Sequence, residues 1–227
     1  MSSIIQEEFE HRQEDIDLII ELINFLSNSN SIIVHPDNEE EHRSYSYDSR
    51  LISTLSGVIS LMTYNQIEST MRGCLEALYD DMTDNNIHYH DLKVDIQKTI
   101  LDGIVKNYPN GNLLHGKVGA ELTKKLPLAS LNIRKVFNGN IDSQKIYKIR
   151  DTYGISFSVN PALRNGVEIT SFKDARNDLA HGNISFSKYG NDNPYTEVID
   201  KSGRVSGYLR AIISGFDSYI EEKKYKS

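Results

Sequence analysis

The chain has 227 residues and a formal net charge of −7, with 38% hydrophobic and 25% charged residues, which excludes a disordered or membrane-embedded chain. No apolar run approaches the about 20 residues that cross a bilayer, and the first residues lack the basic start and apolar run of a secretory signal. Cys74 is the only cysteine, so no intrachain disulfide can form. We therefore expect a cytoplasmic protein without membrane contact.

Hydrophobic periodicity predicts helices along the first half of the chain. Residues 1–27 form the first predicted helix, and the polar residues 28–46, with Pro36 and three consecutive glutamates, form a mobile acidic loop. A long helix follows over 48–82, and the same helical spacing of apolar residues recurs over 89–108.

The second half contains shorter predicted elements. Residues 111–141 are irregular, and a short helix over 142–153 ends just before a glycine. Ser171 caps the next predicted helix, which ends at His181, and the last helix runs over 196–225. Strand-like alternation is scarce, so the expected fold class is all-α, as one elongated helical bundle.

Charge is unevenly distributed along the chain. Residues 1–50 hold 12 acidic and 3 basic residues, whereas residues 111–150 hold 8 basic and 2 acidic ones. Such a basic segment can give an acidic protein a local surface that attracts nucleic acid. A solvated loop and helix face explains the same pattern equally well.

Arg176 and His181 lie five residues apart on a predicted helix, before Gly182, a residue suited to the position just past a helix end. Helical geometry separates them by about 140° around the axis and about 7.5 Å along it, so they do not share one face. A long arginine can still curl toward the region beyond the helix end, where His181 lies. The guanidinium is a permanent donor to phosphate oxygens, and the imidazole can exchange protons near neutral pH. Asn177 can bond the phosphate or orient a partner. These groups suit cleavage of RNA, whose 2′-hydroxyl is its own nucleophile.

Structural interpretations compete with this chemistry. Arg176 can form an ion pair with Asp174 or Asp178 on the same helix. His181 can simply end the helix, where the partial negative charge of the last carbonyls favours a protonated imidazole.

Glu68 lies beside an apolar stripe of the predicted helix over 48–82, and a carboxylate in that position needs a cationic partner. Arg72, four residues further on, is the simplest partner. A contact with Arg176 across the bundle is the second possibility.

The segment Arg176-Asn177-Asp178-Leu179-Ala180-His181-Gly182 resembles the R-x4–6-H motif of the HEPN superfamily (higher eukaryotes and prokaryotes nucleotide-binding). Three further segments resemble a bacterial HEPN-like nuclease group: Gly139-Asn140-Ile141-Asp142, Tyr153-Gly154-Ile155 and the turn at Ser185-Phe186, which a polar connection follows. The specific similarity covers residues 139–225, and the preceding residues match mainly as long helices.

This resemblance implies a single helical domain over residues 1–227 that dimerises and places both motifs in one composite cleft. It implies metal-independent RNA cleavage with no cofactor, in a toxin or phage-defence effector that an antitoxin or defence-system protein accompanies. A catalytically inactive module that binds nucleotide or protein is the alternative, and a purely structural helical subunit is another. The candidate catalytic residues are Arg176, His181 and Asn177, with Glu68 and Asp178 in support. The candidate RNA-binding residues are Lys117, Lys124, Lys125, Arg134 and Lys135.

Other motifs fail on their details. Residues 111–118 nearly match a phosphate-binding P-loop, but Val118 replaces the Ser or Thr that would hold magnesium. His88 and His90 are too few ligands for a defined zinc site. Cys74 lies within an amphipathic helix, where an inert thiol is usual. We therefore expect no metal.

The last predicted helix carries Gly203, Gly207 and Ala211 at four-residue spacing. Glycine inside a helix costs about 1 kcal/mol relative to alanine, so this spacing predicts the close approach of another helix. That helix belongs either to the same chain or to a second copy.

Overall fold

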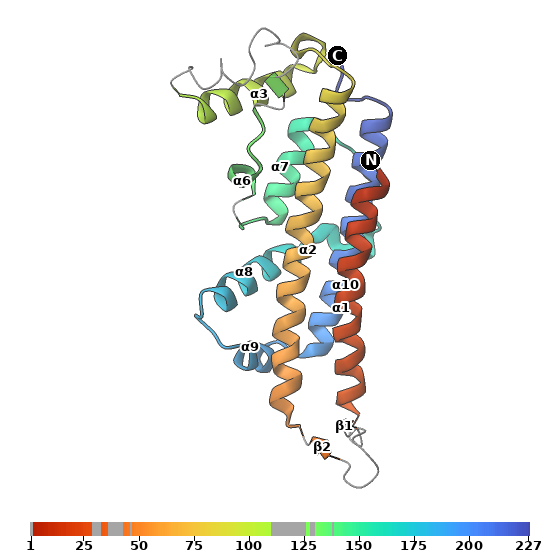
Figure 1. The fold of residues 1–227 in the computed structure, drawn as a ribbon, viewed down its shortest axis with the longest axis vertical. Coiled ribbons are helices and arrows are strands. Elements are labelled where there is room, and N and C mark those ends of the chain that lie inside the picture. The colour runs from red at the N-terminus through yellow and green to blue at the C-terminus, as the bar shows by residue number, and fades with distance from the viewer. Residues whose placement is uncertain are drawn as a thin grey trace.

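Three long helices run side by side along most of the molecule (Figure 1). They are α1 (Ser2–Ser27), α2 (Ser49–Asp84) and α10 (Tyr195–Glu221). The structure is a computed structural model that describes residues 2–28, 33–35, 43–45, 47–109, 126–127, 130–137 and 139–227. The all-α class and the elongated bundle predicted from the sequence are both confirmed.

Shorter elements surround the three long helices. In chain order they are η1 (Tyr89–Asp91), α3 (Val94–Asn107), α6 (Ile133–Val136), α7 (Ser143–Tyr153), η3 (Pro161–Gly166), α8 (Ile169–Ala180) and α9 (Phe186–Asp192). Figure 1 shows α3, α7, α8 and α9 following one another down the same side of α2. The second half of the chain therefore lines one flank of the bundle.

Local signals fix the ends of α2 and α7. The Asp48 side chain accepts a hydrogen bond from the Arg50 N–H, and the Asp142 side chain accepts one from the Lys145 N–H, each at 2.9 Å. These bonds satisfy N–H groups that have no partner within the first turn of a helix. Gly154 ends α7 with φ of +68°, which glycine adopts without a Cβ penalty.

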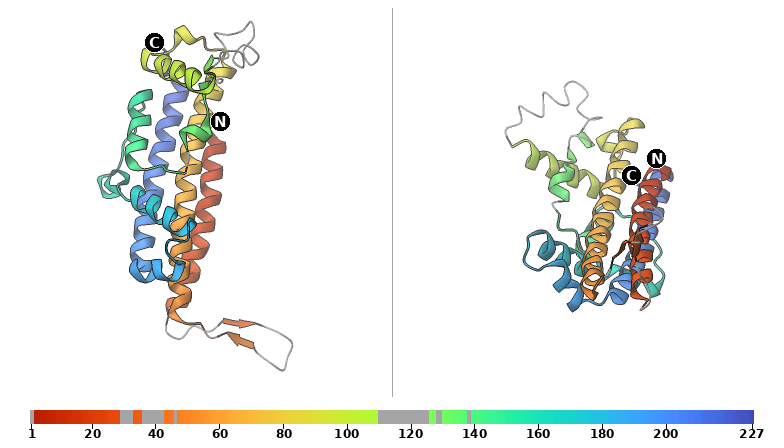
Figure 2. Two further views of the ribbon diagram at one scale, coloured as in Figure 1. Left: turned by 90° about the vertical axis from the view of Figure 1, so that its left-hand side faces the viewer. Right: turned by 60° about the horizontal axis from the view of Figure 1, so that its bottom comes forward.

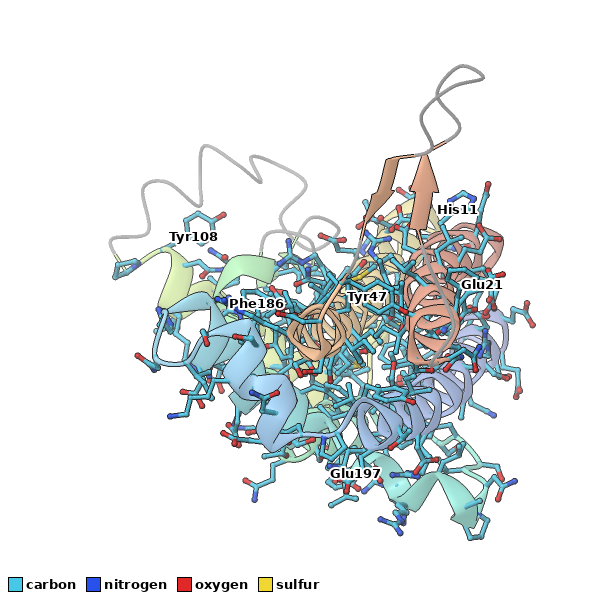
Figure 3. The ribbon with its side chains drawn as sticks, turned by 90° about the horizontal axis from the view of Figure 1, so that it is seen from below. His11, Glu21, Tyr47, Tyr108, Phe186 and Glu197 are labelled. Carbon is cyan, nitrogen blue, oxygen red and sulfur yellow. The ribbon has the colours of Figure 1, made fainter. Side chains whose placement is uncertain are left out.

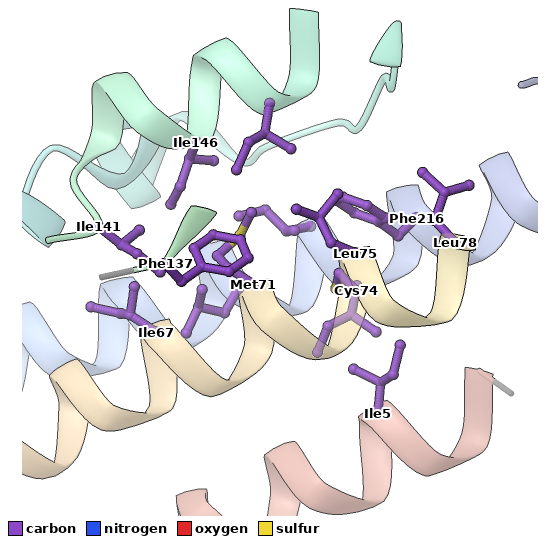
Figure 4. Close-up of a cluster of buried hydrophobic side chains, with 14 of the residues drawn as sticks. Ile5, Ile67, Met71, Cys74, Leu75, Leu78, Phe137, Ile141, Ile146 and Phe216 are labelled. Carbon is purple, nitrogen blue, oxygen red and sulfur yellow. The ribbon is translucent and has the colours of Figure 1, made fainter. Parts of the chain in front are cut away.

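The core lies where α2 meets the other helices. Figure 4 shows α2 side chains, among them Ile67, Met71 and Leu75, against Ile5 of α1 and Phe216 of α10. A further apolar group packs against the same region from the segment around α6 and α7, namely Phe137, Ile141 and Ile146. Burying each such side chain contributes about 1.5–3 kcal/mol. The segment that begins α7 is therefore fixed against α2, which matters for the site described below.

The contact between α2 and α9 is close and partly polar. A Cβ on Gly57 of α2 would lie 2.9 Å from the Phe186 ring, and a Cβ on Gly190 would lie 1.9 Å from the Ser53 carbonyl oxygen. The Ser60 hydroxyl donates to the Tyr189 hydroxyl at 3.0 Å. Figure 3, viewed from below, shows Phe186 where α9 faces α2. Small side chains on both helices thus permit the approach.

The structure differs from the sequence prediction at three places. Within the loop predicted over 28–46, Ile33–His35 (β1) and Arg43–Tyr45 (β2) pair as antiparallel strands that project beyond the end of the bundle (Figure 2). The acidic run of that loop lies outside the described residues. Ser171 lies inside α8 rather than at its cap, and its hydroxyl donates to the Glu168 carbonyl at 2.7 Å. The polar connection expected after residue 186 is instead the helix α9.

The glycines of α10 meet segments of the same chain. A Cβ on Gly207 would lie 2.8 Å from Leu163 of η3, and one on Gly215 would lie 2.6 Å from Phe157. A Cβ on Gly203 would have no atom within 4 Å. The predicted close approach is thus confirmed for Gly207, and the approaching segment comes from this chain.

Candidate functional site

The helix α8 carries the Arg–His motif and is anchored by one apolar face. Ile169, Phe172, Ala175 and Leu179 are buried on that face. His181 is the last residue of the helical turn, and Gly182 follows with φ of +71°. The Gly182 N–H donates to the Leu179 carbonyl and the Asn183 N–H donates to the Asp178 carbonyl, so the glycine ends the helix as predicted.

The Arg176 guanidinium is held from two sides by groups without charge. Its central carbon Cζ lies 5.7 Å from the centroid of the Tyr64 ring, which places the cation within range of the ring's π electrons. Gly139 lies against the same group, because a Cβ there would be 2.8 Å from the Arg176 Nη2 atom. The absence of a side chain at Gly139 therefore makes room for the guanidinium.

A chain of two side-chain amides fixes the rotation of the guanidinium. The Arg176 Nη1 atom donates to the Asn177 Oδ1 atom at 2.9 Å, and the Asn177 Nδ2 atom donates to the Asn140 Oδ1 atom at 3.1 Å. Of the two roles predicted for Asn177, this arrangement matches the orienting one. The amides tie α8 to the segment that precedes α7.

Tyr64 is itself rigidly placed in α2. Its side chain is fully buried, and its hydroxyl accepts a hydrogen bond from the Ile141 N–H at 2.9 Å. Burial raises the pKa of the Tyr64 hydroxyl, and the Glu68 carboxylate acts in the same direction. The ring under Arg176 is therefore a neutral phenol at physiological pH.

Tyr64, Gly139 and Asn140 were not assigned to the site from the sequence. Gly139 and Asn140 stood in a segment quoted for its resemblance to a nuclease group, which was the one available signal. Tyr64 lies 112 positions before Arg176 in the chain, and nothing in the local pattern of α2 indicates that its ring faces an arginine.

Arg176 has no carboxylate partner among the residues that the structure describes. The ion pairs expected as an alternative do not form, because Asp174 contacts Lys173 at 3.6 Å and the Asp178 side chain accepts from Asn183 at 3.2 Å. No direct ion pair therefore holds the guanidinium within the described residues, although the carboxylates of Glu8, Glu68 and Glu76 line the same hollow.

Arg176 opens onto a hollow of about 600 Å³ between α1 and α2, which Glu68 also lines. The Glu68 carboxylate accepts a hydrogen bond from the Arg72 Nη2 atom at 3.0 Å, the simplest pairing predicted from the sequence. No hydrogen bond or ion pair joins Glu68 to Arg176 in the described structure. Glu68 thus shares the hollow with Arg176 without holding it.

His181 is exposed at the end of α8, and its imidazole has no hydrogen-bond partner within the described residues. The Arg176 guanidinium lies against Tyr64 and Gly139 rather than in the curl toward the helix end that the sequence allows. One chain thus presents the two groups separately, one in a hollow and one at a helix end.

The basic residues predicted to bind RNA cannot be placed from the structure. Lys117, Lys124 and Lys125 lie outside the described residues, and only the backbone of Arg134 and Lys135 is described, in α6. Elsewhere in the described chain, no three His, Cys, Asp or Glu side chains gather in a metal-binding cluster. The described helices include none that combines the length and hydropathy of a membrane span.

Comparison with known families decides the assignment of the fold. The family model described as HEPN_MAE_28990-like HEPN matches residues 1–225. The chain belongs to this HEPN family. The HEPN match includes α1 and α2, beyond the region 139–225 where the sequence resemblance was specific. No curated protein and no solved structure matches the chain significantly. HEPN domains are often ribonucleases, commonly dimerise and bind RNA, and many lack catalysis, so the activity of this HEPN protein depends on the chemistry of its own residues.

Proposed function

We propose that this HEPN protein is a metal-independent endoribonuclease that cleaves RNA by attack of a 2′-hydroxyl on the adjacent phosphorus. The observation that supports this most strongly is the Arg176 guanidinium, which Tyr64, Gly139 and Asn177 hold in place without neutralising it. An unpaired charge at a partly buried position is costly to the fold. A phosphate group in the hollow would supply the missing counter-charge through charge-assisted hydrogen bonds.

Each group has a defined role in this reaction. His181 accepts the proton of the 2′-hydroxyl as its oxygen bonds to phosphorus, and the bond to the 5′-oxygen breaks. Arg176 stabilises the negative charge that develops on the phosphoryl oxygens. The leaving 5′-oxygen takes its proton from His181 of the partner subunit in a homodimer. The products are a 2′,3′-cyclic phosphate and a free 5′-hydroxyl.

The family resemblance extends the proposal to a biological role. We assign the protein to the toxins or phage-defence effectors, with an antitoxin or other defence-system protein as its partner. Asp178 and Glu68 are supporting residues at most, since neither contacts Arg176.

Incubation of the pure protein with a defined RNA oligonucleotide tests the reaction. Cleavage should persist in excess chelator and give the two product ends named above. His181→Ala should abolish cleavage, whereas His11→Ala, which removes another exposed histidine, should not. Arg176→Lys should lose most activity because lysine keeps the charge but lacks the planar donor fork.

Circular dichroism should show that all three variants remain folded. A requirement for magnesium, or cleavage that survives His181→Ala, would contradict the mechanism. Absence of cleavage with RNA binding retained would identify the non-catalytic module instead.

A further inference from the structure

A second hollow, of about 300 Å³, lies between α3 and α7 and is lined by basic residues. Its charged side chains are Lys106 on α3, Lys145 and Lys148 on α7, and one carboxylate, Asp102. Hydroxyl and amide groups, among them those of Thr99 and Asn132, complete the polar part of the lining. The local charge of this hollow is therefore positive, whereas the chain as a whole has a net charge of −7.

The two lysines of α7 are not neutralised by the fold. Several lysines elsewhere pair with carboxylates, as Lys98 does with Asp95 and Lys201 does with Glu197. Lys145 and Lys148 have no such partner within the described chain. Since they are three residues apart on a helix, they lie on neighbouring positions of one face and point their charge at the same space.

The segment 139–142 connects the surroundings of Arg176 to α7, whose Lys145 lines the hollow. Gly139 and Asn140 belong to the arrangement around Arg176, and Asp142 contacts Lys173 of α8 at 3.3 Å before it caps α7. Lys145 then follows within the first turn, about 4.5 Å along the axis from Asp142. In Figure 1, α7 lies directly above α8 on the same flank of the bundle.

We propose that the hollow between α3 and α7 binds backbone phosphates of the RNA strand whose cleaved phosphate lies at Arg176. This inference rests on the proposed ribonuclease function. Lys145 and Lys148 supply the charge. Because backbone phosphates are alike along a strand, contacts to them carry no sequence information. The hollow therefore adds affinity for longer RNA strands without selecting their sequence.

Binding of a fully 2′-O-methylated RNA oligonucleotide of about 20 nucleotides tests the hollow independently of cleavage, because that RNA lacks the nucleophile. Each phosphate contact with single-stranded RNA contributes about −0.7 to the slope of log K against log salt. In Lys145→Gln/Lys148→Gln the slope should become shallower by about 1.4, with weaker binding at low salt. Lys201→Gln/Lys224→Gln changes the net charge equally at one residue of α10 and one residue just after its end. Both residues lie outside the hollow, so this variant should bind as the wild type does.

Cleavage then tests whether the hollow serves the same strand. The α7 double variant should have a raised KM for the corresponding unmodified oligonucleotide and unchanged kcat/KM for a dinucleotide, which is too short to reach both sites. Equal loss of binding in both double variants would show a general charge effect and overturn the proposal. Wild-type salt dependence in the α7 variant, or equal competition by a poly-glutamate peptide, would overturn it too. If the wild type binds the methylated RNA through the hollow but cleaves nothing, the ribonuclease proposal fails and the binding site stands.

Discussion

Replacement of Gly139 with alanine should displace the Arg176 guanidinium and thereby lower the rate of RNA cleavage. The added Cβ would lie 2.8 Å from the Arg176 Nη2 atom and 3.2 Å from Cζ. Since comfortable contacts between heavy atoms begin near 3.5 Å, the guanidinium must retreat by about 0.7 Å or more. A misplacement near 1 Å in an active site costs on the order of 100-fold in rate, so we expect kcat/KM for RNA to fall about 100-fold.

The same substitution strains the backbone, and that effect needs its own control. Gly139 has φ of +78°, where a residue other than glycine costs about 1–2 kcal/mol. Gly154 has φ of +68°, but a Cβ there would lie 3.9 Å from the Lys93 Nζ atom, which is an ordinary van der Waals contact. Gly154→Ala should therefore lose a similar free energy of unfolding, measured in urea, and keep its RNA cleavage. Full activity in Gly139→Ala, or equal activity losses in both variants, would refute the role given to the Gly139 contact.

Three other expectations follow from contacts described above. Gly190→Ala should lower the free energy of unfolding by about 1–3 kcal/mol, because its Cβ would press on the Ser53 backbone, and an unchanged urea midpoint would contradict the close packing of α9. Burial acts to raise the pKa of Asp142, but the backbone N–H that it caps and the Lys173 ammonium outweigh burial and lower it below its ordinary 3.8. The ionised carboxylate thus stabilises the fold above that value and loses this effect as the pH falls through the lowered pKa. Asp142→Asn, which can still cap α7, should be less stable than the wild type at neutral pH and equally stable in strong acid, as urea unfolding at each pH will show. A purified heterodimer with one His181→Ala subunit should lose far more than half of the wild-type cleavage rate, whereas retention of half would show that each subunit works alone.

The sequence predicted those helices whose ends are marked by a capping residue or by a terminal glycine. Asp48 and Asp142 cap α2 and α7, and Gly154 and Gly182 end α7 and α8, so these boundaries follow from local chemistry. The helix α9 has only seven residues with a glycine among them, and its stability comes from packing against α2 rather than from helix propensity. The pairing of β1 with β2 likewise depends on a partner strand that a local pattern does not reveal.

The candidate site likewise has one part that the local sequence predicts and another part that depends on tertiary contacts. The motif on α8 was visible because its members lie within one helix, and Gly182 follows them with the expected conformation. The direction of the Arg176 side chain was left open by the sequence, because it is decided by the Tyr64 ring and by the space above Gly139. Both come from distant parts of the chain, and such tertiary contacts outweigh the short-range geometry of a helix.

The groups that hold Arg176 come from three separate stretches of the chain, and this has a consequence for protein synthesis. Tyr64 leaves the ribosome long before Gly139, and Arg176 emerges later still, so the guanidinium has no fixed position until the second half of the chain has packed against α2. If the proposed ribonuclease function is correct, a nascent chain would lack the positioned arginine that cleavage needs. The arginine reaches its observed position only when the late-emerging flank of the bundle has packed on α2.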